Sequence, residues 1–261
     1  MALSIRQSEI LELARHDGRV HVDDLAQRFD VTLQTIRRDL GDLAEAGLVD
    51  RVHGGAVPRT GVVNLGYRSR RRMNAEAKAA IAAACAAEIA DNSSMILNPG
   101  TSTEAVAHAL VNHQNITVVT NNMNVANILL ANPGCEIMVA GGALRRSDGG
   151  IVGEMTTQFI EQFKVDFAVI GTSGLDQDGD LLDYDLAEVR VSRAILRQSR
   201  RAFVVTDHSK VGRSAPARIA SLSEIDTLFT DRPLPARIKG LCADWGTRLR
   251  ICSTAGSDHP E

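Results

Sequence analysis

The sequence predicts an α/β protein of two domains. The first is a small N-terminal domain of three helices and a hairpin, and the second has a doubly wound, mostly parallel sheet. Residues 5–57 carry short helical apolar patterns and end in a Gly-Gly turn. From residue 75 onward, short apolar strands alternate with helical segments, which is the pattern of a parallel sheet with crossover helices. A chain of 261 residues is long enough to bury a sizeable core.

The overall composition excludes some classes of protein. The formal net charge is −3 and the pI is about 6.2, so the chain is not coated in positive charge, although a local basic patch is compatible with both values. No run of about 18 apolar residues is present, and the first ten residues lack the apolar segment of a signal peptide. We therefore expect a cytoplasmic protein without membrane spans.

The cysteines do not form a metal or redox motif. None of them belongs to a CxxC pair, and no histidine cluster accompanies them. We expect reduced, mostly buried thiols, with no metal site and no cofactor. The cysteines are Cys85, Cys135, Cys242 and Cys252.

The first two helices are short. The second covers DDLAQRF at 23–29 and lacks a good N-cap, since His21 and Val22 stand where Ser or Thr would serve better. The first helix has one apolar face. That face consists of Ile5, Ile10, Leu11, Leu13 and Ala14.

The third helix has clear boundaries. Thr32 is a suitable N-cap, and we expect the helix to run to about Ala46 and to stop at Gly47. The stretch LVDRVHGGAV then suits a small hairpin. At about 100° per residue, one face of the helix is apolar and must pack inward. That face consists of Leu33, Ile36, Leu40 and Leu43.

The polar side of the third helix suits DNA. The order of two helices, a tight turn and a hairpin is that of a winged helix-turn-helix, whose second helix enters the major groove by its N-terminal residues. Gln34 and Arg38 can bond purine edges, Thr35 can contact a base or a phosphate, and Arg37 is placed for phosphate. The candidate DNA contacts are Thr32, Gln34, Thr35, Arg37, Arg38, Arg51 and His53.

A solvated helix face is the alternative for these arginines. Residues 1–57 hold seven Arg against ten Asp and Glu, so the domain as a whole is not basic. Binding to double-stranded DNA must therefore rely on a local patch and on two or more copies of the chain acting together. A homodimer or homotetramer built through the second domain is expected.

The remaining chain divides into three parts. Residues 58–74 contain five arginines and no acid, and we predict a linker, so that the DNA-binding domain spans 1–57. Residues 75–252 form the second domain, which begins with an Ala-rich helix. Residues 253–261 are expected to be a disordered tail. The predicted strands of the second domain are SMILN, ITVVT, EIMVA, FAVIG, AFVVT, TLFT and LRIC, and its further helices are expected at about 103–110, 124–131, 156–163 and 187–198.

Polar, Gly-rich turns follow several of the strands. Ligands of doubly wound sheets bind outside the carboxyl ends of the strands. The PGTST turn offers backbone N–H groups and hydroxyls that can cradle a phosphate at a helix N-terminus, and Lys210 can supply a countercharge. One such loop alone is more often just a turn, but several at successive strand ends converge. The effector-binding candidates are Asn98, Gly100, Thr101, Ser102, Thr103, Asn121, Asn122, Gly142, Gly171 and Lys210.

The stretch TLQTIRRDLGDLAEAGLVDRVHGGA resembles the DNA-binding signature of the DeoR family of bacterial regulators. The similarity continues to about residue 252 through EAVAHAL, TNNMNVAN, AGGALRRSDGGIVGE and DHSKVGR. The resemblance implies a winged helix-turn-helix followed by a sugar-phosphate sensor related in fold to ribose-5-phosphate isomerase and acetyl-CoA transferases. It also implies a repressor of a carbon-metabolism operon, released from operator DNA by a phosphorylated polyol or sugar, with glycerol 3-phosphate expected first.

One residue departs from the family pattern and bears on the alternatives. The family commonly has an Asp where this chain has Asn98, and an amide cannot act as a general base. A second hypothesis is a sugar-phosphate isomerase-like enzyme with an accessory domain. Asn98 favours a sensor over this enzyme, so we assign no catalytic residues. A third hypothesis is a regulator tuned to another sugar phosphate. The polar residues Asp183, Tyr184, Glu188 and Asp207 are expected near the pocket rim, with capping or ion pairing as an equal alternative role.

Overall fold

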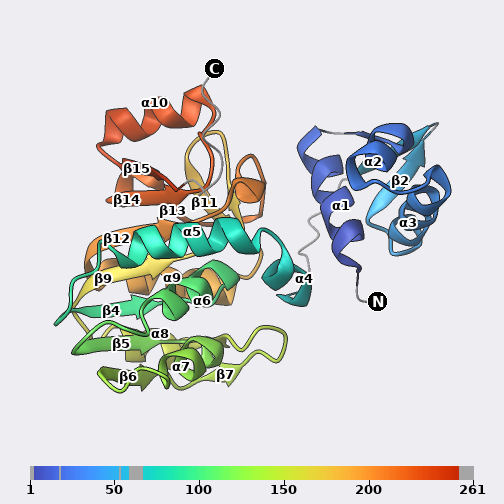
Figure 1. Ribbon diagram of the computed structural model, residues 1–261. Coiled ribbons are helices and arrows are strands. Elements are labelled where there is room, and N and C mark those ends of the chain that lie inside the picture. The colour runs from blue at the N-terminus through green and yellow to red at the C-terminus, as the bar shows by residue number, and fades with distance from the viewer. Residues whose placement is uncertain (1–2, 18, 53, 59–66, 253–261) are drawn as a thin grey trace. The chain divides into compact units, whose positions relative to one another are not determined.

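The computed structural model of the chain describes residues 3–17, 19–52, 54–58 and 67–252. It divides into two compact units, Met1–Met73 and Asn74–Glu261. Within the described residues, no helix is both long enough and apolar enough to cross a membrane. The helices and strands are labelled in Figure 1.

The N-terminal unit is a three-helix domain with a small antiparallel sheet. Its three strands are in the order β1-β3-β2. The described part of the predicted linker 58–74 includes the short helix α4, and Met73 is buried with the core of this unit. The elements are α1 (Ile5–Asp17), β1 (Val20–His21), α2 (Val22–Phe29), α3 (Leu33–Glu45), β2 (Val49–Val52), β3 (Gly55–Pro58) and α4 (Tyr67–Arg72).

The predicted ends of α3 are confirmed. The hydroxyl of Thr32 accepts a hydrogen bond from the backbone N–H of Thr35 at 3.2 Å, and Gly47 follows the helix with a φ of +70°. The inward prediction for Leu33 was wrong, because this side chain is 41% exposed in the first turn, before core contact begins at Ile36. Ile5, in the first turn of α1, is exposed for the same reason.

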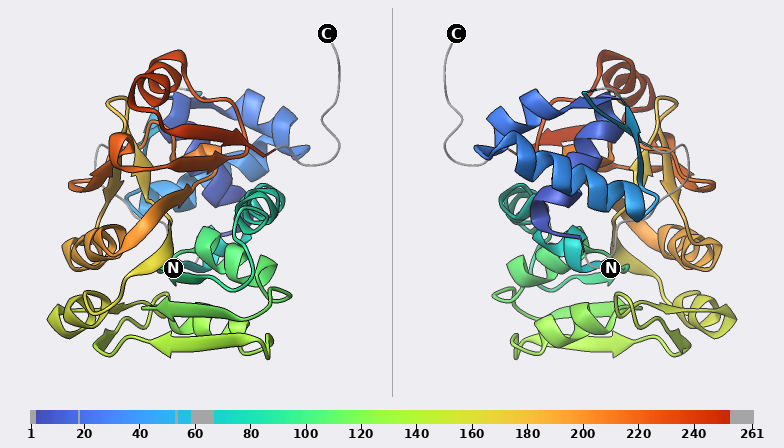
Figure 2. Two further views of the ribbon diagram at one scale, coloured as in Figure 1. Left: turned by 90° about the vertical axis from the view of Figure 1, so that its left-hand side faces the viewer. Right: turned by 90° about the vertical axis from the view of Figure 1, so that its right-hand side faces the viewer.

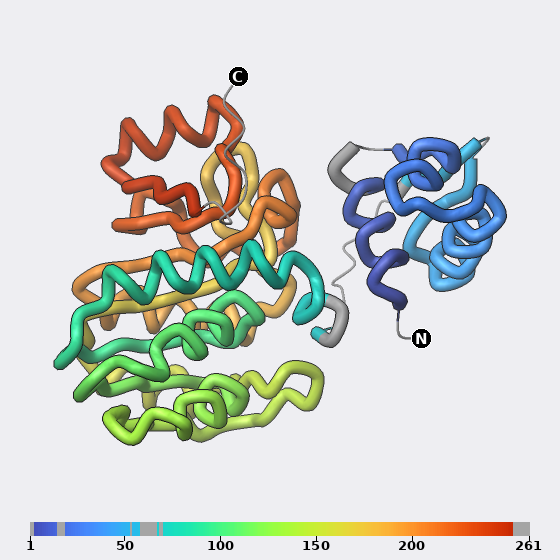
Figure 3. Tube along the Cα trace, viewed as in Figure 1, coloured from blue at the N-terminus to red at the C-terminus, as the bar shows by residue number. Residues whose placement is uncertain are grey.

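The C-terminal unit is built on a seven-stranded sheet in which every pairing is parallel. Its order is β15-β14-β12-β9-β4-β5-β6, so the colours in Figure 3 run from the middle strands toward green at one edge and toward red at the other. All seven predicted strands are confirmed. They are β4 (Ser94–Leu97), β5 (Ile116–Thr120), β6 (Cys135–Val139), β9 (Val165–Ile170), β12 (Ser199–Val205), β14 (Thr227–Thr230) and β15 (Arg248–Ile251).

This strand order has a switch point between β4 and β9, where the chain reverses the direction in which it adds strands. Helices cover both faces, as Figure 2 shows. One apolar cluster joins α5, α6 and α7 to one face, and another joins α8, α9 and α10 to the opposite face. The helices are α5 (Ala75–Ala86), α6 (Thr101–Ala109), α7 (Met123–Leu129), α8 (Glu154–Ile160), α9 (Leu186–Arg197) and α10 (Ala236–Trp245).

Several smaller elements were not predicted. A second sheet has the order β10-β11-β13, and a hairpin of two short strands precedes α8. A 3₁₀ turn, η1, holds the DHSK residues after β12. These elements are β7 (Ala143–Leu144), β8 (Ile151–Val152), β10 (Gly174–Leu175), β11 (Asp180–Asp183), η1 (His208–Lys210), β13 (Ala217–Ser221) and the 3₁₀ turn η2 (Leu222–Glu224).

Candidate functional site

The first turns of α3 present the predicted DNA contacts to solvent. Gln34, Arg37 and Arg38 are exposed and Thr35 is half-buried. Within the described chain, neither arginine forms an ion pair, so both charges are available to a phosphate or a base. Arg51 is exposed on β2, whereas His53 lies outside the residues that the structure describes.

Two of the three acidic residues on α3, Asp39 and Asp42, are paired with side chains of α1. Asp39 is 6% exposed and accepts from Arg6 Nε at 2.5 Å, and Asp42 accepts from Gln7 Nε2 at 2.9 Å. These contacts fix α3 against the first turn of α1. Because Asp39 and Asp42 pair with α1, they do not pair with Arg38, although the domain holds more acids than arginines.

A shallow groove of about 520 Å³ lies between the start of α1 and the start of α3. Its lining is polar and includes four of the predicted DNA contacts. The sequence analysis gave no role to the residues that α1 contributes, because nothing in a local pattern pairs α1 with α3. The lining residues are Ser4, Arg6, Gln7, Thr32, Gln34, Thr35, Arg38, Asp39 and Asp42.

In the C-terminal unit, Asn98 bridges the two strands at the switch point. It follows β4, and its Oδ1 accepts from the backbone N–H of Gly171, which follows β9, at 2.9 Å. Its Nδ2 donates to Ser192 Oγ at 3.3 Å. The amide both accepts and donates here, which a carboxylate cannot do. Asn98 is 1% exposed, so its amide is a buried part of the switch point, and doubly wound sheets bind ligands at such points.

The PGTST turn leads directly into α6. Gly100 is the N-cap residue, and the buried hydroxyl of Thr103 donates to the backbone carbonyls of Asn98 and Gly100, at 2.8 Å each. In the described chain, the half-buried hydroxyls of Thr101 and Ser102 have no hydrogen-bond partner. Thr103 therefore holds the turn, and the other two hydroxyls stand at the positive end of a nine-residue helix.

Asn121 and Asn122 follow β5, next to β4. Asn121 Nδ2 donates to the Ile151 carbonyl at 2.9 Å, and its buried Oδ1 has no partner among the described residues. Asn122 caps α7 by accepting from the backbone N–H of Asn124 at 2.8 Å. Of the two predicted amides, Asn121 keeps an oxygen for a ligand hydroxyl or a water, and Asn122 is used in capping.

Two further buried hydroxyls lie at strand ends of the same sheet. Thr206 follows β12 and Thr230 ends β14, and neither Oγ1 has a partner in the described part of the chain. Sequence analysis passed over both, because a Thr at the end of an apolar strand looks like part of the strand.

Gly142 is required by packing. Its φ is +146°, and a Cβ there would lie 2.2 Å from Thr156 Oγ1 and 2.8 Å from the Val152 carbonyl oxygen. We expect Gly142→Ala to lower the free energy of unfolding by about 1–3 kcal/mol, measured by urea denaturation. Adding Thr156→Ala should recover part of the loss, because it removes the nearer atom. Strictly additive effects of the two substitutions would contradict this account.

Lys210 lies in η1, where a buried carboxylate organises its surroundings. Asp207 is 1% exposed and caps η1 by accepting from the Ser209 N–H at 3.1 Å. Burial by itself raises the pKa of Asp207, but the charges of Lys210 and Lys78 outweigh it, so the pKa lies below its ordinary value. Lys78, only 5% exposed on α5, was missed because it stands alone in an Ala-rich helix.

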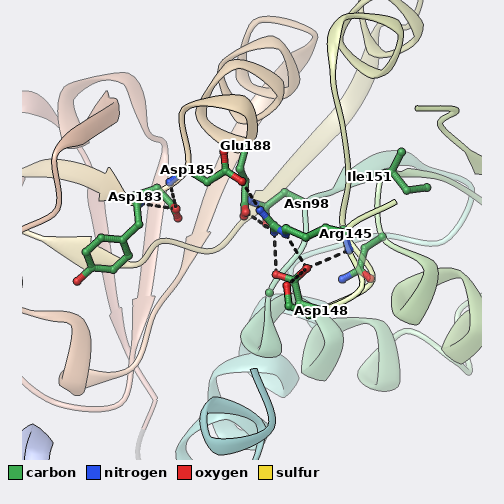
Figure 4. Close-up of polar contacts among 12 residues, drawn as sticks. Asn98, Arg145, Asp148, Ile151, Asp183, Asp185 and Glu188 are labelled. Atoms are coloured by element: carbon green, nitrogen blue, oxygen red, sulfur yellow. Dashed lines mark hydrogen bonds and ion pairs between the residues drawn. The ribbon is translucent and has the colours of Figure 1, made fainter. Parts of the chain in front are cut away.

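Arg145 is a candidate functional residue that the sequence analysis did not predict. It belongs to the β7–β8 hairpin and reaches carboxylates on both sides, as Figure 4 shows. A Cβ at Gly150 would lie 3.0 Å from Arg145 Nη2 and 3.2 Å from Pro99 Cγ, so the guanidinium is next to the PGTST turn. The partners of Arg145 are Asp148 at 2.7 Å, Asp185 at 2.7 Å and Glu188 at 2.5 Å.

Glu188 makes stability depend on pH. Burial raises its pKa to about 7, with a further rise from the charge of Asp183 and opposition from Arg145. The folded state therefore holds a proton that the unfolded state loses near pH 4.5, so this contribution to stability is lost as pH rises toward 7. Relative to Glu188→Gln, the wild type should lose on the order of 2–3 kcal/mol of unfolding free energy between pH 5 and 8.

Urea denaturation of wild type and Glu188→Gln at several pH values checks this expectation, because the difference between the two proteins cancels the other titrating groups. A difference that does not change with pH would show that Glu188 titrates normally.

No set of three or more His, Cys, Asp or Glu side chains is placed to hold a metal ion, as far as the structure describes the chain. The four cysteines are free, and burial raises the pKa of the thiols of Cys85, Cys135, Cys242 and Cys252.

Comparison with known proteins finds a family model for each part of the chain. The model of the DeoR-like helix-turn-helix domain matches residues 6–60, and that of the DeoR C-terminal sensor domain matches residues 73–232. The glycerol-3-phosphate regulon repressor of Escherichia coli (strain K12) is 44% identical over 247 residues, covering 95% of this chain and 98% of that repressor. The repressor of the same name from Haemophilus influenzae is 42% identical over 253 residues, covering 97% and 98%.

Among solved structures, ribose 5-phosphate isomerase from Methanocaldococcus jannaschii has a TM-score of 0.40 and 12% identity, over 53% of this chain and 55% of the isomerase. The relatives with high identity are named repressors, so the prediction that this chain is not an enzyme is confirmed. The two domain models match in order along the chain, and the relatives align along nearly their whole length. This chain therefore belongs to the DeoR family of DNA-binding transcriptional regulators.

Proposed function

We propose that this protein represses a carbon-metabolism operon in the cytoplasm and that glycerol 3-phosphate releases it from operator DNA. The two repressors reported above carry the name of the glycerol-3-phosphate regulon and share 44% and 42% identity with this chain. The observation that carries the proposal is the junction of Asn98 and Gly171 at the switch point, followed in the chain by Thr101 and Ser102, whose hydroxyls have no hydrogen-bond partner among the described residues.

The arrangement suits a phosphorylated polyol. The start of α6 offers backbone N–H groups, two hydroxyls and a positive helix end, which together favour a phosphate. Asn121 Oδ1 is a buried acceptor without a partner in the described chain, and a polyol hydroxyl can donate to it. Lys210 supplies positive charge, and Arg145 supplies a guanidinium whose charge is already opposed by Asp148, Asp185 and Glu188. We propose that the effector-binding candidates predicted from the sequence, together with Arg145, form the binding site.

The DNA-binding half of the proposal depends on α3. Gln34, Thr35 and Arg38 would read base edges, and Thr32, Arg37 and Arg51 would contact phosphates. His53 stays a prediction. A homodimer or homotetramer is proposed, because one small reading helix in a domain of net negative charge gives little specificity by itself.

Fluorescence anisotropy tests both halves of the proposal. The protein is titrated onto DNA from upstream of its own and neighbouring genes, at an ionic strength of about 0.15 M, with and without glycerol 3-phosphate. Selective binding that weakens with glycerol 3-phosphate is the expected result. Selective binding that ignores it but responds to another sugar phosphate would move the effector assignment to that compound. Absence of selective binding would overturn the repressor proposal.

A further inference from the structure

The border between the two compact units falls on one peptide bond. Met73 is buried with the apolar core of the N-terminal unit, whereas Asn74 is the N-cap residue of α5 in the C-terminal unit. A contact that holds Asn74 therefore fixes the first residue of the sensor unit.

A single buried carboxylate holds Asn74. Its Nδ2 donates to Asp207 Oδ1 at 2.8 Å, across 133 residues of sequence. The backbone of Asn74 has a φ of +52°, in the left-handed region that Asn enters more easily than most residues. Asp207 is 1% exposed, so water does not compete for this hydrogen bond.

The same carboxylate holds the turn that carries Lys210. Asp207 Oδ1 also accepts from the Ser209 N–H at 3.1 Å, and the Asp207 carbonyl accepts from the Lys210 N–H at 3.0 Å. On the other side, the Lys78 N–H donates to the Asn74 carbonyl at 2.9 Å, in the first turn of α5. The Asp207 carboxylate is also attracted by the positive charges of Lys210, in η1, and of Lys78, in the first turn of α5.

We propose that Asp207 and Asn74 couple the effector site to the junction with the DNA-binding domain. The inference rests on the proposed function, in which phosphate binds beside Lys210. A bound phosphate competes with Asp207 for the positive charge of Lys210. This competition changes the relative strength of the two hydrogen bonds that the Asp207 carboxylate accepts, one from the Ser209 N–H of η1 and one from Asn74. The start of α5, and with it the entry of the chain from Met73, then differs between the free and bound states.

A ligand shifts a conformational equilibrium only through its difference in affinity for the two states. The Asn74–Asp207 contact supplies such a difference if its strength changes when phosphate binds. By linkage, the same coupling must appear in both directions: effector weakens operator binding, and operator weakens effector binding by the same factor.

Asn74→Gly tests the coupling without straining the backbone, because Gly accepts a positive φ and only the amide is lost. Asn92→Gly is the matched control. Asn92 is also an Asn at positive φ, is exposed, and has a side-chain hydrogen bond with Asn115 at 2.9 Å. For each full-length protein, operator affinity is measured by anisotropy with and without glycerol 3-phosphate, and affinity for glycerol 3-phosphate by calorimetry with and without operator.

We expect wild type and Asn92→Gly to lose operator affinity by a factor within the usual range for allosteric coupling, about 5–150-fold, on adding glycerol 3-phosphate. Asn74→Gly should bind each ligand alone as wild type does, yet show less than about a twofold effect of one ligand on the other. A purely structural role would lower both affinities or the melting temperature and leave the ratio unchanged.

Two results would overturn the inference. Release of operator from Asn74→Gly to the same extent as from wild type would show that this contact does not transmit the signal. Loss of glycerol 3-phosphate binding in Asn74→Gly would place Asn74 in the binding site and not in the coupling. A wild type that ignores glycerol 3-phosphate would instead overturn the proposed function, and the inference with it.

Discussion

Arg38→Ala is expected to abolish selective operator binding and to leave effector binding intact. Arg38 is exposed on α3, forms no ion pair within the described chain, and borders the groove next to Gln34 and Thr35. A bidentate contact of Arg with guanine contributes about 1–3 kcal/mol of discrimination, and a dimer loses it twice. Specific binding typically exceeds non-specific binding by about 4–10 kcal/mol, so the loss removes much of that gap.

Arg28→Ala is the matched control for Arg38→Ala. Arg28 is also an exposed arginine, in the last turn of α2, and has no proposed contact with a base. Anisotropy is measured with operator DNA and with scrambled DNA. Arg38→Ala should bind the two DNAs with similar affinity, because only its preference for the operator is lost. Calorimetry with glycerol 3-phosphate checks that the sensor domain is unaffected. Normal operator binding by Arg38→Ala would mean that α3 does not read the DNA through this side chain.

The elements of the fold that sequence predicts well are those with their own local signal. Each of the seven strands of the main sheet is a short apolar run, because both faces of a parallel sheet are covered by helices. The helix α10 has no such signal, since it follows Pro235 without a side-chain cap and buries only Ile238 and Cys242. The prediction that Leu33 packs inward was wrong because helical periodicity takes no account of whether another element covers the first turn, and here Leu33 is exposed.

The candidate site divides in the same way. The turns after β4 and β5 could be chosen from sequence, because Gly, Ser, Thr and Asn gather there. The charged contacts could not be predicted, because their partners lie far apart in the chain. Arg145 meets Glu188 43 residues later, and Asn74 meets Asp207 133 residues later. Such pairs are decided by how the hairpin and η1 pack, which no local pattern records.

Ser102→Asp is expected to give a repressor that binds operator normally and no longer responds to effector. Ser102 is the second residue of α6, where a carboxylate interacts favourably with the helix dipole by about 0.3–1 kcal/mol, so the fold should be slightly stabilised. The same carboxylate repels a phosphate. Two unit charges 5 Å apart interact by about 3 kcal/mol at an effective dielectric constant of 20.

A repulsion of that size corresponds to a loss of effector affinity of roughly a hundredfold or more. Ser102→Asn has nearly the same shape without the charge and should retain the effector response. Ala236→Asp adds the same charge at the exposed first position of α10 and should also retain it. Calorimetry with glycerol 3-phosphate and operator anisotropy provide the measurements. If Ser102→Asp were released from operator as readily as Ser102→Asn, the phosphate would have to bind away from the start of α6.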